Sequence, residues 1–487
     1  MVSDRLRRTI RERLEAEQGR IEKEAPFRVA LTYPSPYGVG MSSLGFQTIY
    51  RLLQGLDGVA CERVFLPDEA TDPGAALDAP VSYESRTPLG EFDLVAVSVA
   101  YELELAGLVR LLDAAGLGAL REERAPGAPL VLAGGPLTFS NPLPLAPFVD
   151  AVVMGEAEGV LGPALDALRT APDRARALER LAATPHVFVP AHHGDRLPLL
   201  ATAVPEALPA FAAIRTPHAE LRDLFLIEPE RGCSRGCAYC VMRRSAAGGM
   251  RVIPIERTLA RVPDDARRVG LVGAAVSDHP HIRELLDALA DRGCEVGLSS
   301  LRPDRLDDAF VASLRRAGYR TLTTALDGAS ERLREQVDRR SHERHFRAAA
   351  EAARRHGMDR LKLYLMVGLP GETDDDLDEC ARFVGELSRI LPVALGIAPF
   401  CAKRRTPLDG APFAGVRVID ARLGRLRRAL RGRADVRATS ARWAWVEHVL
   451  AQGGPDEGRA VGAAVRSGGR FADLRRALAP LGHRPDR

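Results

Sequence analysis

The sequence predicts an α/β protein with two successive sheets of parallel strands and a helical tail. Near-continuous apolar runs alternate with helical patterns between residues 26 and 160, and a second alternation begins at Leu224. From about residue 416 onward the patterns are helical. Apolar strands that alternate with helices are typical of parallel sheets covered on both faces.

These changes of pattern divide the chain into five expected parts. They are a charged N-terminal helix, a doubly wound α/β domain, a linker region, a partial barrel and a helical C-terminal extension, at residues 1–25, 26–160, 161–223, 224–415 and 416–487. A chain of 487 residues is long enough for two or three domains with substantial cores.

The composition is that of an ordered globular protein, with 46% hydrophobic and 27% charged residues. No run of about 18 apolar residues suggests a membrane span, and the charged N-terminus lacks the apolar stretch of a signal peptide. We therefore expect a cytoplasmic protein without a membrane partner. A net charge of +3 does not indicate a nucleic-acid binder, but the Arg-rich segment 421–443 leaves that partner open.

The first domain begins with a strand at 27–34 and a helix at 41–56, where Ser42 and Ser43 are placed to cap the helix N-terminus. Further strands are expected at 60–67, 93–100, 129–136 and 150–158. Doubly wound (Rossmann-like) sheets of this kind bind ligands beyond the carboxyl ends of their strands.

The second alternation contains six strand candidates with helical connections. They lie at 224–230, 268–275, 295–300, 321–326, 360–368 and 393–400. Six such units predict a partial (β/α)6 TIM-type barrel, open on one side, with its active site in the loops after the strands. The helical tail is expected to close the open side or the floor.

Three of the seven cysteines, Cys233, Cys237 and Cys240, stand at C-x3-C-x2-C spacing in the loop after the first barrel strand. A structural zinc site needs a fourth Cys or His nearby, and none follows Cys240 within about 20 residues. Buried cysteines without a shared function are a second alternative. The spacing favours an iron–sulfur cluster in which one iron lacks a protein ligand and is free to bind an exchangeable one.

Polar and glycine residues follow the other barrel strands, so they are expected to converge on the same rim. In chain order they are Gly273, Ser277, Asp278, Ser299, Ser300, Arg302, Asp327, the segment 367–372 and Lys403.

The cysteine motif, with Tyr239 before its last cysteine, resembles the signature of the radical S-adenosylmethionine superfamily. The resemblance covers roughly 224–410. It implies a [4Fe-4S] cluster on the three cysteines and chelation of the fourth iron by the amino and carboxylate groups of S-adenosylmethionine. It also implies reductive cleavage to a 5′-deoxyadenosyl radical, and a small electron donor such as ferredoxin or flavodoxin.

The resemblance also implies roles for the rim residues. Tyr239 corresponds to the residue bordering the adenine. Gly273–Ala275 stand where many members have Gly-Gly-Glu, so the contact to the amino group is expected to be missing or moved to Ser277 or Asp278. Ser299 and Arg302 correspond to the position that holds ribose or carboxylate. Asp327 stands where relatives often have Glu, and Val367, Gly368 and Gly371 belong to the segment packing on the adenine.

The N-terminal domain resembles that of the cobalamin-binding subgroup, in the segments "YPSPYGVGMSSLGFQTIYRLL", "LVLAGGP" and "VVMGEAE". The resemblance implies possible cobalamin contacts at Gly40, Met41, Ser42, Ser43, Gly134 and Gly135. The Asp-x-His-x-x-Gly motif that supplies an axial histidine in some cobalamin proteins is absent.

Several functions remain open at this point. With cobalamin, methyl transfer to an unactivated carbon is expected; with a vestigial domain, hydrogen abstraction or a methylthiolation-type reaction. Two further alternatives are an iron–sulfur electron-transfer protein, whose cluster would need a fourth cysteine ligand, and an RNA-modification factor that uses the Arg-rich tail. The sequence does not identify the substrate.

Overall fold

The computed structural model describes residues 3–72, 75, 77–243, 248–299 and 301–486, and the chain forms two compact units. Unit 1 comprises Met1–Leu224 with Val449–His483, and unit 2 comprises Phe225–His448 with Arg484–Arg487. The division falls within helix α15 (Ala441–Gln452). The N-terminal 224 residues and a C-terminal segment, Val449–His483, therefore contribute to unit 1.

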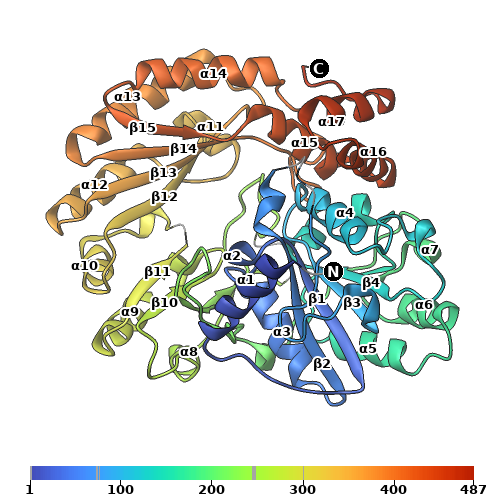
Figure 1. Ribbon diagram of the computed structural model, residues 1–487. Coiled ribbons are helices and arrows are strands. Elements are labelled where there is room, and N and C mark those ends of the chain that lie inside the picture. Colours follow the sequence, from blue (N-terminus) through green and yellow to red (C-terminus); the bar gives the residue numbers. More distant parts are fainter. Residues whose placement is uncertain (1–2, 73–74, 76, 244–247, 300, 487) are drawn as a thin grey trace. The chain divides into compact units, whose positions relative to one another are not determined.

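Unit 1 is built on a six-stranded sheet in the order β2-β1-β3-β4-β5-β6 (Figure 1). Its strands are β1 (Phe27–Pro36), β2 (Val59–Leu66), β3 (Leu94–Ser98), β4 (Leu130–Gly134), β5 (Ala151–Val153) and β6 (Val187–Phe188). The first five pair in parallel, and only β6 is antiparallel to its neighbour. The predicted doubly wound sheet is confirmed, with a reversal of strand order between β1 and β3.

The helices of unit 1 come from two parts of the chain. They are α1 (Asp4–Glu15), α2 (Tyr37–Gly40), α3 (Leu44–Gly55), α4 (Glu104–Ala114), α5 (Leu161–Arg169), α6 (Arg174–Ala183), α7 (Pro190–His193), α16 (Pro455–Arg466) and α17 (Phe471–Leu478). The expected N-terminal helix is shorter than predicted. It ends at Glu15, and Gly19 then adopts φ +90° where a Cβ would lie 2.2 Å from the carbonyl oxygen of Ala213.

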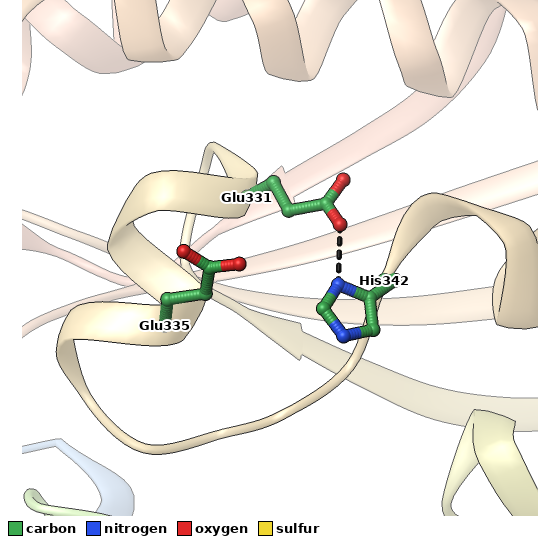
Figure 2. Close-up of side chains that lie close together, drawn as sticks. All are labelled: Glu331, Glu335 and His342. Carbon is green, nitrogen blue, oxygen red and sulfur yellow. Dashed lines mark hydrogen bonds and ion pairs between the residues drawn. The ribbon is translucent and has the colours of Figure 1, made fainter.

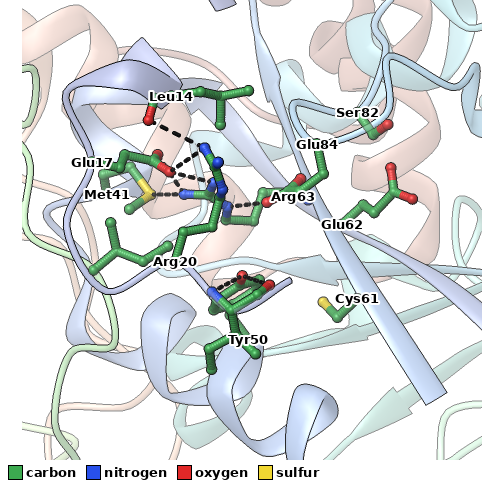
Figure 3. A network of polar contacts seen from close by, with 12 residues as sticks. Leu14, Glu17, Arg20, Met41, Tyr50, Cys61, Glu62, Arg63, Ser82 and Glu84 are labelled. Carbon is green, nitrogen blue, oxygen red and sulfur yellow. Dashed lines mark hydrogen bonds and ion pairs between the residues drawn. The ribbon is translucent and has the colours of Figure 1, made fainter. Parts of the chain in front are cut away.

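A buried ion network fixes the segment after α1 against the sheet (Figure 3). Arg63 on β2 donates from both terminal nitrogens to Glu17, at 2.7 and 2.8 Å, and from Nε to Glu84 at 2.7 Å. The Tyr37 hydroxyl donates to the same Glu17 carboxylate at 2.7 Å. Because the Arg63 side chain is fully buried, the two carboxylates supply the charge that water no longer can.

The C-terminal part of unit 1 is held by the buried side chain of Asn141. Its Nδ2 donates to the carbonyl oxygens of Leu450, Ala451 and Gly453, at 3.1, 3.1 and 2.7 Å. On α16, a Cβ at Gly458 would lie 2.1 Å from the carbonyl oxygen of Pro144, so only glycine permits this approach.

Unit 2 contains two parallel sheets, β7-β10-β11 and β12-β13-β14-β15. Its main strands are β7 (Phe225–Ile227), β10 (Arg268–Leu271), β11 (Glu295–Leu298), β12 (Thr321–Asp327), β13 (Arg360–Val367), β14 (Val393–Pro399) and β15 (Ala434–Ala438). A parallel bridge between Leu301 and Thr324 joins β12 to the segment after β11. All six predicted strands are present, in the predicted parallel order.

One strand lies where only helices were expected. Residues Ala434–Ala438 form β15, a seventh parallel strand on the edge of β14. Asp435 and Arg437 flank Val436, so the segment lacks the apolar run typical of a buried strand. The prediction of a purely helical tail is wrong at this point.

Helices follow the strands of unit 2 as the barrel pattern predicts (Figure 1). They are α8 (Ile255–Leu259), α9 (Ile282–Asp291), α10 (Asp308–Arg316), α11 (Glu331–Gln336), α12 (Glu343–Arg355), α13 (Asp374–Ile390) and α14 (Val416–Ala429). A two-stranded antiparallel pair, β8 (Glu230–Arg231) and β9 (Arg251–Val252), brackets the cysteine loop.

Candidate functional site

The cysteine loop leaves the first barrel strand through β8. Gly232 follows β8 with φ +87°, and a Cβ there would lie 1.9 Å from the carbonyl oxygen of Gly249. Only glycine allows the two ends of the loop to approach so closely. Cys237 is buried, whereas Cys233 and Cys240 are half-buried. The loop therefore presents three thiols at the carboxyl end of β7.

The spacing of the three thiols does not suit a single metal ion. In tetrahedral zinc sites the Zn–S distance of 2.3 Å brings ligand sulfurs to about 3.8 Å from one another. Among the described residues, the only set of three or more possible ligand atoms within 4.8 Å of one another is Glu331, Glu335 and His342. The three sulfurs do not form such a set, so at least one pair of them is more than 4.8 Å apart. All seven cysteines are free thiols.

Asp278 holds the cysteine loop in place from the end of β10. Its carboxylate accepts hydrogen bonds from Ser234 Oγ at 2.8 Å and from Arg235 Nε at 2.7 Å, both within the loop. It also pairs with Arg305 at 3.2 Å. Burial raises the pKa of Asp278, but the donors from Arg235 and Ser234 outweigh it and hold the pKa at about 2. Asp278 is thus engaged by the loop itself.

Ser277 and Arg302 form a second link across the rim. Ser277 Oγ accepts from the backbone N–H of Arg302 at 3.0 Å, and the Arg302 guanidinium pairs with Asp304 at 3.0 Å. Asp304 also reaches Arg235 at 3.5 Å. The ends of β10 and β11 are therefore tied to each other and to the cysteine loop.

Asp327, at the end of β12, faces the cysteine loop. It has φ +62° and pairs with Arg339 at 2.7 Å. Burial is the main reason that the pKa of Tyr239 is raised, and the neighbouring Asp327 carboxylate raises it further. Tyr239, Asp327 and the thiol of Cys237 therefore lie near the guanidinium of Arg339, a residue that the sequence did not indicate.

Ser299 and Gly273 also meet, since Ser299 Oγ donates to the carbonyl oxygen of Gly273 at 2.9 Å. Ser300 lies outside the described residues. Val367 is buried at the end of β13, and the N–H of Gly368 donates to Glu372 at 2.9 Å. Gly368 and Gly371 have positive φ, of +96° and +74°, as a tight turn after a strand requires.

Glu230, in β8, is a site residue that the sequence reasoning missed. Its side chain is buried, and Oε1 accepts the backbone N–H of Ala275 at 2.8 Å. Burial raises its pKa to about 7, against the smaller opposing effect of that hydrogen bond. The only signal in the sequence is a second acidic residue in "EPERGC", directly before the first cysteine.

Lys403, one of the residues expected on the rim, pairs with Glu447 at 2.8 Å.

A cluster of possible metal ligands lies on and after α11 (Figure 2). It contains the carboxylates of Glu331 and Glu335, one turn apart on α11, and the imidazole of His342, which is in contact with Glu331. Glu335 is exposed and the other two are half-exposed. Since exposed acidic groups often lie together without an ion, we assign this cluster no cofactor.

In unit 1, the predicted cobalamin contacts lie after β1 and β4. Met41 is buried, and Cβ on Gly40 would lie 2.5 Å from the ring of Phe65. Ser42 Oγ donates to the carbonyl oxygen of Gly38 at 2.7 Å, and Ser43 Oγ accepts from Phe46 N–H at 3.3 Å as the cap of α3.

Gly134 ends β4, and Gly135 has φ +110° where a Cβ would lie 2.6 Å from the carbonyl oxygen of Val99. At the reversal between β1 and β3, Tyr33 and Glu104 are buried and hydrogen-bonded to each other. Ser42, Ser43 and Gly135 thus have a local role in the turns of unit 1, and the cobalamin contacts stay a prediction.

Two family patterns match the chain. Residues 45–190 match "Radical SAM proteins, N-terminal", and residues 227–384 match "Radical SAM superfamily". Among proteins with curated names, "Uncharacterized protein MJ0966" of Methanocaldococcus jannaschii is 26% identical over 396 residues, covering 79% of this chain and 80% of that protein. Ribosomal protein uS12 methylthiotransferase RimO of Geobacter sulfurreducens is 28% identical over 171 residues, which are 32% of this chain and 38% of RimO.

Among solved structures, the chain resembles the cobalamin-dependent S-adenosylmethionine radical enzyme OxsB with aqua-cobalamin and S-adenosylmethionine bound. The TM-score is 0.53 at 13% identity, and the match covers 84% of this chain. It covers 56% of OxsB, so the chain spans little more than half the length of that enzyme. At this identity the likeness shows a common fold. In the described part of the chain, no helix is both long and apolar enough to span a membrane.

Proposed function

Because the chain belongs to the radical SAM superfamily, with a cobalamin-type domain preceding its barrel, we propose that Cys233, Cys237 and Cys240 hold a [4Fe-4S] cluster that cleaves S-adenosylmethionine and starts a radical reaction. The observation that carries the proposal is the loop with three thiols and no fourth, fixed at the carboxyl ends of parallel barrel strands.

The bound cluster would supply one electron to the sulfonium of S-adenosylmethionine, and the protein supplies positioning. Asp278 and Asp304 hold the arginine within the cysteine loop, which keeps the loop on the ends of β10 and β11. The Arg339 guanidinium lies near the thiol of Cys237, and charge and hydrogen bonding around cluster sulfurs influence reduction potential. These contacts orient the loop before any ligand is bound.

The other cysteines support this function over an electron-transfer protein, which would give every iron a protein ligand. The thiol of Cys294 donates to the carbonyl oxygen of Ala266 at 3.2 Å, and that of Cys401 to Ala444 at 3.1 Å. Cys380 is buried within α13. Free thiols throughout also support a reducing compartment, the cytoplasm, where a ferredoxin or flavodoxin would donate the electron.

Anaerobic reconstitution with iron and sulfide tests the proposal. We expect about four irons per chain and release of 5′-deoxyadenosine when S-adenosylmethionine and a reductant are added. A protein that retains no iron, or that retains it without releasing 5′-deoxyadenosine, would contradict the proposal. The same product can identify the substrate. When a deuterium-labelled candidate is the substrate, hydrogen abstraction transfers deuterium to the 5′-deoxyadenosine.

The strand order of unit 1 and its likeness to OxsB favour a second, finer function, cobalamin-dependent methyl transfer. Gel filtration of the reconstituted protein with hydroxocobalamin tests this function, since bound cobalamin would be detected by its visible absorption in the protein fraction. If cobalamin does not co-elute, unit 1 has only a structural role. Hydrogen abstraction, or methylthiolation of the kind that names RimO, would then be the remaining reactions.

A further inference from the structure

Three carboxylates lie next to the cysteine loop, and they differ in their partners. Glu228 forms two hydrogen bonds with Arg231, at 2.9 and 2.7 Å. Asp278 pairs with Arg235 and Arg305. Glu230 has no cationic partner among the described residues, although its side chain is completely buried.

The geometry of Glu230 leaves one oxygen unused. Oε1 accepts from Ala275, but the equally buried Oε2 has no donor in the described structure. The carboxylate lies in the space that a side chain at position 273 would take, since a Cβ on Gly273 would be 2.2 Å from Oε1. A buried carboxylate oxygen without a donor is costly and calls for one from a ligand.

We propose that Glu230 Oε2 accepts a hydrogen bond from the α-amino group of S-adenosylmethionine. The proposal rests on the function proposed above. Glu230 stands three residues before Cys233, beside the backbone of Gly273–Ala275, where the sequence lacks the glutamate that many relatives have. Ser277 and Asp278, the residues expected to take over this contact, are both engaged by other partners.

The chemistry of the ligand selects the amino group. The sulfonium carries no hydrogen-bond donor, and the carboxylate of S-adenosylmethionine would be repelled by Glu230. The ribose hydroxyls and the adenine amino group are also donors, but only the α-amino group would bind the open iron of a cluster held by this loop. Glu230 is therefore proposed as a binding residue at the start of the cysteine loop.

Isothermal titration of the reconstituted protein under anaerobic conditions tests the contact, with two ligands and matched variants. The ligands are S-adenosylmethionine and its analogue that lacks the α-amino group. For Glu230→Gln we expect S-adenosylmethionine to bind roughly 10- to 100-fold more weakly, because a hydrogen bond to a charged group is lost. The analogue should bind the variant and the wild type equally. Glu228→Gln, a change at the neighbouring paired carboxylate, should leave the ratio of the two affinities unchanged.

Two outcomes would overturn the proposal: unchanged binding of S-adenosylmethionine to Glu230→Gln, or an equal loss of affinity for both ligands. Iron content is measured on the same samples, and if Glu230→Gln does not retain iron, Glu230→Asp takes its place. That variant keeps the charge but shortens the reach, so it should lose part of the preference for S-adenosylmethionine over the analogue; an undiminished preference would overturn the contact. If the wild type itself binds neither iron nor S-adenosylmethionine, the proposed function fails, which is a different result.

Discussion

In unit 1 the buried guanidinium of Arg63 lies between two carboxylates, whereas in unit 2 the buried carboxylate of Glu230 has an oxygen with no donor from the described residues. Both side chains are buried and have no hydrogen bonds to solvent. The fold supplies carboxylate acceptors for the Arg63 guanidinium, as a structural group requires, but within the described part of the chain it supplies no donor for the second oxygen of Glu230. The contrast shows that unit 1 is complete without a partner at this network, while the cysteine site retains an unmet need for a donor.

The largest expected effect comes from the cysteines. Cys237→Ser should abolish iron retention and 5′-deoxyadenosine release, because a serine hydroxyl is a poor iron ligand in place of a thiolate. Cys294→Ser is the control, since a hydroxyl can keep the hydrogen bond to Ala266. Iron analysis and chromatography of the products distinguish them; equal loss in both would mean that the effect is on folding.

The variant Arg63→Met tests how much the ion pairs of Arg63 stabilise unit 1. The substitution leaves Glu17 and Glu84 without the Arg63 cation, so we expect the free energy of unfolding to fall by about 3–5 kcal/mol. Arg176→Met removes an exposed pair with Glu179 and should cost about 0–1 kcal/mol. Denaturant titration measures both, and similar losses would show that burial does not set the difference.

Glu104 makes the stability of unit 1 depend on pH. Burial raises its pKa in the folded protein from 4.5 to about 7. The unfolded chain therefore releases this proton first, and the contribution to stability is present below pH 4.5 and lost as pH rises through 7. Relative to the wild type, Glu104→Gln should gain about 3 kcal/mol between pH 4.5 and 8. Denaturation at both pH values checks this; a constant difference would contradict the raised pKa.

Asp278→Asn should have the smallest effect and separates holding the loop from binding a ligand. Weaker pairing with Arg235 is expected to make the cluster several-fold more sensitive to air, seen as faster bleaching of its visible absorption. The preference for S-adenosylmethionine over the analogue without the amino group should stay as in the wild type. A reduced preference would return to Asp278 the role that we propose for Glu230. Glu284→Gln, at an exposed pair with His281, is the control.

The strands of both sheets could be predicted from the sequence because they are buried on both faces and therefore form apolar runs. It was insufficient for β15, whose edge position tolerates Asp435 and Arg437. The cysteines were predicted because their spacing is local. Glu230 was missed because its partner, Ala275, is 45 residues away in the chain. Asp278 was expected on the same rim as the cysteine loop and contacts it, whereas Ser277 pairs with Arg302, because these partners depend on distances that only the fold sets.

The hydrogen bonds of Asn141 have a consequence for folding during translation. The Asn141 side chain donates to the carbonyl oxygens of residues 450, 451 and 453, which the ribosome synthesises more than 300 residues later. Residues Phe225–His448 of unit 2 are synthesised in between. Unit 1 therefore completes its fold only after the strands of the barrel have been made, and the barrel can fold while unit 1 still lacks α16 and α17.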